Sequence, residues 1–389
     1  MIGMKVPFFK LTLSAADKRA VRKTLDSGWL TTGPRCAELE QLLCNTTGAK
    51  YAVALSSASA GLLVALRVCD IGQGDEVVTT SFTFAATVAA IEQVGATAVL
   101  ADINPISLNI CPQSAAKKVT KRTKAILAVD IAGKPCDYQA LKTLSRNHSL
   151  KLITDAAHSL GAVYRGKPIG SISDVTVFSF YSTKNITCGE GGALVTNSKR
   201  FATRARRLSS HGLSSSTQLR NKTGGWEYDI VEYGMKANLS DTSAALAHSR
   251  LLRIELFQRQ RQALASFYNK SLRHLAHLID LPRENEHSVH AWHLYIFKLK
   301  PEAWRISRER FIVELQKRGV GCGVHYIPVH QLTHFKNSKL VRGASNRNLP
   351  ATAKISQSVV TLPLYPELKR SEAAFVCRQI GLIAKKHAR

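Results

Sequence analysis

The chain has 389 residues, 45% of them hydrophobic, which is enough for a large core divided between two domains. No apolar stretch approaches the roughly 20 residues of a membrane span, and the N-terminal stretch lacks the apolar core of a signal peptide. The eight cysteines are scattered without a C-x-x-C pair, which predicts reduced thiols and neither disulfides nor a metal site. We therefore expect a cytoplasmic protein without a membrane partner.

The chain is strongly basic, with 54 Lys and Arg against 27 Asp and Glu and a formal net charge of +27. Such a charge attracts anions, including nucleic acids and phosphorylated substrates. The densest basic run is 199–207, but most of the excess is spread along the chain, without interleaved aromatic residues for base stacking. We therefore expect a solvated basic surface and no nucleic-acid partner.

The first half of the chain predicts two helices followed by a regular alternation of strands and helices. The helices cover 14–27 and 35–47, separated by a stretch with glycine and proline. Apolar strands are predicted at 51–55, 76–80, 97–101, 124–129 and 151–154, with helices at 57–69, 84–94 and 137–147. This alternation predicts a mostly parallel sheet covered on both faces, in which ligands bind beyond the carboxyl ends of the strands.

The second half predicts a separate, smaller α/β domain. After residue 197 the pattern is helical to about residue 275, interrupted by a polar loop at 214–228. Strands at 293–300 and 320–326 and helices at 307–318 and 371–385 follow. We expect a large domain over 1–250 and a C-terminal domain over 251–389.

One lysine lies in a distinctive position within residues 174–197. Two β-rich runs, 175–181 and 193–196, flank a turn rich in glycine and threonine, and Lys184 lies where the first run ends. Such a lysine can form a Schiff base with an aldehyde if burial keeps it partly neutral. A solvated loop lysine is the more common case, so the stretch alone leaves both interpretations open.

Other polar residues follow strand ends. Asp155 ends an apolar strand, where its carboxylate can pair with a pyridine nitrogen or cap a helix. Ser57 to Ser59 open a helix directly after a strand, which suits either a phosphate or simple capping. Ser179 could add a hydroxyl to the same phosphate or be a core serine. Phe84, at a strand-to-helix turn, could stack on a planar cofactor or belong to the core.

Taken together, eight stretches in this order resemble the DegT/DnrJ/StrS family of sugar aminotransferases, which use pyridoxal phosphate. The stretches are distributed over nearly the whole chain. Each stretch alone is a weak signal of the family, and their common order makes the signal strong. The stretches are SGWLTTGP (27–34), LSSASAGL (55–62), GDEVVTTSFTFAAT (74–87), DAAHSLGA (155–162), FSFYSTKNITCGEGGALVTN (178–197), GMKANLSD (234–241), HAWHLYIF (290–297) and GVGCGVHYIP (319–328).

The resemblance implies the aspartate-aminotransferase fold (fold type I of pyridoxal-phosphate enzymes), a homodimer and a set of site roles. Lys184 forms the Schiff base, Asp155 holds the pyridine nitrogen, and His158 lies near the ring oxygen. Phe84 stacks on the ring. The implied phosphate ligands are Ala58, Ser59, Ser179 and, from the partner subunit, Asn238, with the 28–33 loop near the site.

One branch of the family looks closest in the stretches KNITCGEGG and HAWHL. This branch aminates UDP-4-keto-pentose, with L-glutamate as amino donor, in lipopolysaccharide and lipid A modification. Some positions depart from the family, including Thr154 before the aspartate, Asp130 where histidine is frequent, and Phe84 where this branch has tryptophan. A 3-keto or 4-keto-6-deoxy sugar is therefore an alternative substrate.

Two alternatives concern the activity itself. The first is a dehydratase of the family, but such an enzyme would carry histidine in place of Lys184, so Lys184 argues against it. A non-catalytic, nucleic-acid-binding regulator on the same fold is the alternative from another class.

Overall fold

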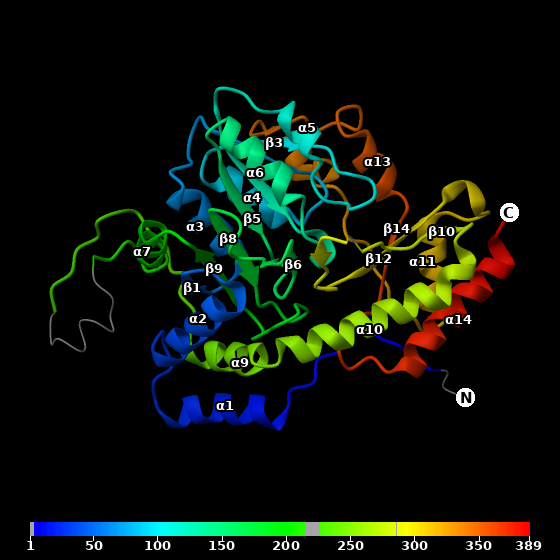
Figure 1. Ribbon diagram of the computed structural model, residues 1–389, viewed down its shortest axis with the longest axis horizontal. Helices are drawn as coiled ribbons and strands as arrows, with labels where there is room; N and C mark the ends of the chain where they lie inside the picture. Colours follow the sequence, from blue (N-terminus) through cyan, green and yellow to red (C-terminus); the bar gives the residue numbers. More distant parts are fainter. Residues whose placement is uncertain (1–3, 215–225, 285) are drawn as a thin grey trace.

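The computed structural model describes residues 4–214, 226–284 and 286–389. Within them, an eight-stranded sheet has helices on both faces (Figure 1), which confirms the predicted α/β fold. Five strand pairs are parallel, whereas β9 runs antiparallel to both β1 and β8. In spatial order the strands are β1 (Tyr51–Leu55), β9 (Gly192–Thr196), β8 (Val175–Ser179), β5 (Lys151–Asp155), β4 (Thr123–Val129), β2 (Glu76–Thr80), β3 (Thr97–Ala101) and β13 (Val341–Arg342).

Alternate residues of the strands face two separate apolar layers, because successive side chains of a strand point to opposite faces. Val53 and Leu55 of β1 belong to one layer, and Ala52 and Ala54 belong to the other. The first layer is covered by α3 (Ala58–Val68), α4 (Ala85–Gln93) and α7 (Lys199–Leu208). The second is covered by α2 (Pro34–Thr47), α5 (Pro112–Ala116), α6 (Tyr138–Asn147) and α9 (Asp241–Leu251).

The helix ends follow local sequence signals. Ser14 and Asp17 form a capping box at the start of α1 (Ala15–Asp26), which packs against α9. Pro34 opens α2, and Gly48 ends it in a left-handed conformation with φ of 68° that suits glycine. These signals explain why the predicted helices at 14–27 and 35–47 agree with the structure.

The C-terminal part has its own sheet and core. Its sheet consists of β10 (Ile279–Asp280), β12 (Tyr295–Leu299) and β14 (Val359–Leu362), and its helices are α10 (Ile254–Leu272), α11 (Arg308–Lys317) and α14 (Arg370–His387). The predicted strand at 320–326 is wrong, because this stretch forms only isolated bridges at Val320 and Gly323. The domain division at residue 250 stays a prediction.

Strand pairing is among the contacts that join the C-terminal part to the rest of the chain. The short strand β13 pairs in parallel with β3, as Val341 with Ala98 and Arg342 with Val99. Near the N-terminus, Val6 forms a parallel bridge with Val320 and belongs to the C-terminal core. Figure 1 shows α10 running from the central sheet to the C-terminal helices.

The remaining elements are short. They are β6 (Val163–Tyr164), β7 (Lys167–Pro168), β11 (Ser288–Val289), α12 (Thr333–Asn337), α13 (Pro350–Ser356) and the 3₁₀ turns η1 (Ile131–Gly133), η2 (Arg273–Leu275), η3 (Pro301–Ala303) and η4 (Val329–Gln331). Most of the predicted 214–228 loop lies outside the described residues. Among the helices that the structure describes, none is long and apolar enough to cross a membrane.

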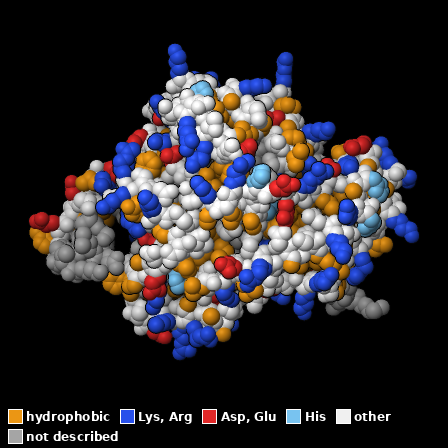
Figure 2. Space-filling view, in the orientation of Figure 1, with side chains coloured by type: hydrophobic (Ala, Val, Ile, Leu, Met, Phe, Trp, Pro, Cys, Tyr) orange, Lys and Arg blue, Asp and Glu red, His pale blue; other side chains and the backbone are white. Residues whose placement is uncertain are grey.

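The basic side chains are spread over the surface. Figure 2 shows lysine and arginine scattered over the visible face, with acidic side chains between them. Much of the basic run on α7 is paired, since Arg204 contacts Asp70 and Glu232, and Arg206 contacts Glu40. The distribution agrees with a solvated basic surface.

Candidate active site

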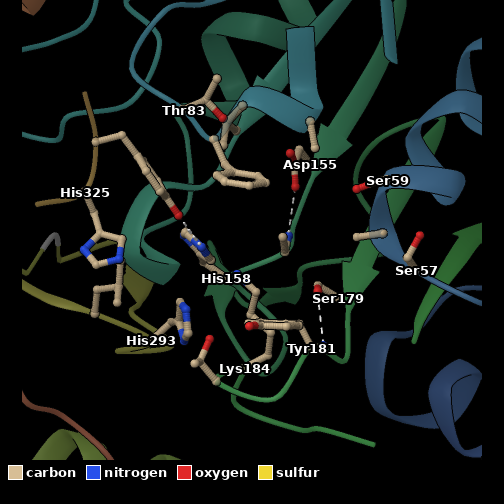
Figure 3. Close-up of a pocket in the computed structure, with 18 of the residues that line it drawn as sticks. Ser57, Ser59, Thr83, Asp155, His158, Ser179, Tyr181, Lys184, His293 and His325 are labelled. Atoms are coloured by element: carbon tan, nitrogen blue, oxygen red, sulfur yellow. Dashed lines mark hydrogen bonds between the residues drawn. The ribbon is translucent and has the colours of Figure 1, made fainter. Parts of the chain in front are cut away.

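A cavity of about 550 Å³ opens at the carboxyl ends of the parallel strands, where the alternation of strands and helices predicted a ligand site (Figure 3). Both parts of the chain contribute to its walls. It brings together seven of the eight predicted site residues, which are Ala58, Ser59, Phe84, Asp155, His158, Ser179 and Lys184. Asn238 is absent from its lining.

Lys184 lies in the turn that follows β8. Its backbone N–H donates to the Tyr181 carbonyl at 2.9 Å, which fixes the start of the turn. The half-buried side chain reaches the cavity. Burial lowers the pKa of its ammonium group to about 8, an effect that the Asp155 carboxylate opposes. A substantial fraction of the Lys184 amine is therefore neutral near physiological pH, as nucleophilic or base chemistry requires.

Asp155 ends β5 and is only 6% exposed. Its Oδ2 accepts a hydrogen bond from Thr87 Oγ1 at 2.8 Å, and its Oδ1 accepts one from the Ala157 N–H at 3.1 Å. Burial raises the pKa of the carboxyl, while Thr87, Ala157 and the Lys184 charge oppose the rise. A turn rather than a helix follows, so the carboxylate is not a helix cap.

The start of α3 forms the opposite end of the cavity. Ser57 is the N-cap, and its Oγ accepts from the Ala60 N–H at 3.1 Å. Ala58 and Ser59 lie in the first turn, whose N–H groups lack helical acceptors. Gly192 lies against this turn, where an added Cβ would be 2.6 Å from the Ala58 nitrogen. Only glycine lets β9 approach so closely.

The remaining predicted groups line the walls. Phe84, the N-cap of α4, is 61% exposed with its ring at the cavity. The Nε2 atom of His158 is hydrogen-bonded to the Tyr326 hydroxyl at 3.1 Å, and its buried Nδ1 has no partner among the described residues. Burial holds the His158 pKa well below its usual value, so the ring is neutral. Ser179 Oγ accepts from the Tyr181 N–H at 3.3 Å.

Asn238 anchors the 28–33 loop within its own chain. Its Nδ2 donates to Thr32 Oγ1 at 2.6 Å, and Thr32 Oγ1 donates to the Leu239 carbonyl at 2.5 Å. Ser240, rather than Asn238, caps α9. The Oδ1 atom of Asn238 is buried without a partner among the described residues.

The lining residues that received no role from the sequence include the ring-bearing groups His293, His325 and Tyr326. The ring centroids of His293 and His158 lie 4.4 Å apart, and His325 Nδ1 is 2.9 Å from Thr361 Oγ1. All three occur in the stretches HAWHL and GVHYIP, so the motifs themselves were the available signal. They reach the cavity only because the C-terminal part packs over the strand ends.

Residues 12–381 match the DegT/DnrJ/EryC1/StrS aminotransferase family. The chain belongs to this family. It is 36% identical over 383 residues to the uncharacterized protein MJ1066 of Methanocaldococcus jannaschii, covering 98% of both chains. Aminotransferases of this family act on sugars and use pyridoxal phosphate.

Solved structures agree with this assignment. The PLP form of Spr1654 from Streptococcus pneumoniae is 31% identical with a TM-score of 0.91, covering 98% of this chain and 99% of its own. Helicobacter pylori PseC, an aminotransferase involved in pseudoaminic acid biosynthesis, is 26% identical with a TM-score of 0.87, covering 98% and 100%. The fold is therefore that of a pyridoxal-phosphate aminotransferase.

The cavity fits this cofactor on its own geometry. The α3 N-terminus, brought close to β9 by Gly192, offers N–H groups and hydroxyls to a phosphate. A buried carboxylate, an exposed aromatic face and an imidazole nitrogen that has no partner within the described part of the chain lie around the same cavity as the amine of Lys184. This donor set suits a planar pyridine ring with a phosphate at one end and an aldehyde at the other.

Proposed function

We propose that the protein transfers an amino group from L-glutamate to a nucleotide-linked ketosugar, UDP-4-keto-pentose or a related 4-keto sugar. The observation that carries this proposal is the meeting of Lys184 and Asp155 in one cavity with the α3 N-terminus. Their mutual electrostatic influence on pKa supports a joint role. The similarity of KNITCGEGG and HAWHL to the arabinose branch supports the substrate, in lipid A modification.

The proposed roles of the chain's residues follow from their positions. Ala58, Ser59 and Ser179 hold the cofactor phosphate, Asp155 pairs with the ring nitrogen, and Phe84 and His158 contact the ring. Pyridoxal phosphate, when bound, supplies an electron sink for the carbon from which a proton is removed. Asp155, held by Thr87 and Ala157, keeps a negative charge at the nitrogen end of the cavity.

Lys184 is the proposed proton carrier. Its amine would hold the cofactor covalently between reactions and would be free to act as a base once the amino donor is bound. The neutral Nζ would then take the proton from Cα of glutamate and, as an acid, return it to the cofactor carbon that carries the nitrogen. In the second half-reaction it would take a proton from that carbon and deliver it to the sugar carbon that receives nitrogen. A pKa of about 8 lets one group accept and donate near neutral pH.

We further propose that the protein is a cytoplasmic homodimer in which Asn238 contributes to the partner's site. The eight cysteines are free thiols, which supports a reducing compartment. The segment after residue 225 exposes large apolar side chains, with Trp226 80% and Tyr233 85% exposed. Such a surface is typical of an interface, and a second copy of the chain is the occupant that the shared-site arrangement requires.

A direct test uses the protein in its pyridoxamine phosphate form. It is mixed in turn with UDP-4-keto-pentose, a 4-keto-6-deoxy and a 3-keto nucleotide sugar, while the absorbance of the pyridoxal form is followed. Only UDP-4-keto-pentose should restore the absorbance of the pyridoxal form rapidly. Faster return with either of the others would reassign the sugar. Failure of glutamate to bleach the pyridoxal form would favour a non-catalytic protein, whose one support is the +27 charge.

A further inference from the structure

A second, smaller cavity lies beside the active cavity, and Leu294 lines both. Its volume is about 160 Å³, several times the roughly 30 Å³ that one water takes up in the liquid. Its walls come from the 106–108 loop, the η1 turn, the 280–283 turn and β12. A tetrahedral oxyanion fits such a volume, whereas a whole nucleotide does not.

The charged lining of this cavity is mainly basic. Lys134, Lys298 and Arg283 line it together with one acid, Asp280. Asp280 is shared, since it lies 3.7 Å from Lys298 and also 3.7 Å from Lys300. Burial and repulsion from Lys298 lower the pKa of Lys134, and burial lowers the pKa of Lys298. A bound anion would relieve this repulsion.

Each of the two lysines keeps hydrogen-bond donors to spare. Lys134 Nζ donates to the Arg283 carbonyl at 2.8 Å, and Lys298 Nζ donates to the Pro105 carbonyl at 2.9 Å. An ammonium group has three donors, so neither is used up. The carbonyl bonds hold both amino groups in place without neutralising them, and Asp280, which Lys298 shares with Lys300, offsets only part of the positive charge.

A buried histidine adds a neutral donor. The Nδ1 atom of His290 accepts the Trp292 N–H at 2.8 Å, and the two rings stack with centroids 4.0 Å apart. Burial lowers the His290 pKa to about 3, so the ring is neutral and its proton lies on Nε2. His290 lines the cavity beside the two ammonium groups.

We propose that Lys134, Lys298 and His290 form a binding site for a small dianion of the phosphate class, separate from the active cavity. The ligand is inorganic phosphate or the phosphoryl group of a small phosphomonoester. Two lysines and a neutral histidine line a space of matching size, with a single acid among the charged groups, and charge-assisted hydrogen bonds are the strong contacts by which phosphates are held. This inference does not depend on the identity of the sugar.

Calorimetry with the cofactor-loaded protein tests the proposal. Unbound cofactor is first removed, so that the α3 cradle is filled while no free phosphate ester competes. Inorganic phosphate is titrated into the wild type, Lys134→Met, Lys298→Met and the control Lys300→Met. Lys300 lies on the same side of β12, next to Asp280, and its Nζ donates to the Ala276 carbonyl at 2.7 Å, but it does not line the cavity.

Lys134→Met and Lys298→Met should each weaken phosphate binding about tenfold or more, because each removes a charge-assisted contact. Lys300→Met removes the same charge and should bind like the wild type. Lys298→Arg should retain binding, which separates loss of charge from misfolding. Glycerol 3-phosphate in place of phosphate distinguishes a phosphomonoester ligand from the free ion. No binding to the wild type, or equal binding to all variants, would overturn the proposal.

Discussion

Lys184 combines a reactive position with a lowered pKa. Its ordinary pKa of 10.5 falls to about 8 because partial removal from water disfavours the charged form, so the neutral fraction rises with pH and levels off above about 8. The rate at which the cofactor-free protein captures pyridoxal phosphate should follow this fraction. Stopped-flow absorbance across the pH range measures it. A rate that keeps rising toward pH 10 would indicate an unperturbed lysine.

The attachment site can be located independently. Borohydride reduction of the loaded protein followed by peptide mapping should place the pyridoxyl group on Lys184, and Lys184→Ala should lose turnover while still binding cofactor non-covalently. A pyridoxyl group on another lysine would refute the assignment.

Asp155 faces the same cavity with its carboxylate held by two donors. Asp155→Asn preserves its shape and removes the charge, so folding should be little affected. Loss of a charge-assisted bond worth about 1.5–3 kcal/mol should slow each half-reaction roughly ten- to a hundredfold. Single-turnover kinetics with glutamate measure the effect. Wild-type rates with cofactor bound would contradict the proposed role.

At the level of the element, the junction of β9 and α3 depends on one glycine. An added Cβ at Gly192 would lie 2.6 Å from the Ala58 nitrogen and 2.7 Å from the Ser57 carbonyl carbon, both backbone atoms that cannot swing away. Gly192→Ala should therefore displace the first turn of α3 and weaken cofactor retention. Equilibrium dialysis of the cofactor measures this.

Gly381→Ala is the matched control, because its added Cβ meets nothing within 4 Å and lies inside α14. It should leave cofactor retention unchanged and raise helix stability slightly, since alanine is the better helix former. Equal cofactor retention in the two variants would show that the cradle tolerates the displacement.

The elements also show how far sequence reasoning reaches. Asp155 ends β5 and Lys184 lies in the turn after β8, and both strands are short β-rich runs followed by turns, so their positions were predictable to within two residues. The two-residue strand β13 is too short to show any periodicity, and only tertiary pairing with β3 makes it a strand. His293 and Tyr326 belong to motifs quoted above, but their approach to His158 is set by packing between the two parts of the chain.

For the whole molecule, the proposed shared site predicts a specific complementation. Lys184→Ala and Asn238→Ala should each be impaired as homodimers. In a mixed dimer, one site collects both lesions and the other is intact. After random subunit exchange half of the dimers are mixed, so about a quarter of the sites should recover, as two-fold symmetry requires.

Activity after mixing, with exchange verified by differently tagged subunits, is the measurement. If Asn238 serves only its own chain, where it holds Thr32, each site of a mixed dimer carries one lesion. Activity then stays low despite exchange, and the shared-site proposal fails.

The pairing of β13 with β3 also has a consequence for how the chain is made. The edge of the central sheet is completed by residues 341 and 342, and Arg342 contacts the otherwise buried Glu76 on β2. A nascent chain emerges from the ribosome in sequence order. Some 240 further residues are therefore synthesised after β3 before β13, its neighbour on the outer side of the sheet, exists. During synthesis the open edge of β3 is a template for foreign strands. The protein thus completes its native sheet only near the end of translation, and a chaperone would be most useful before that point, while the edge of β3 is open.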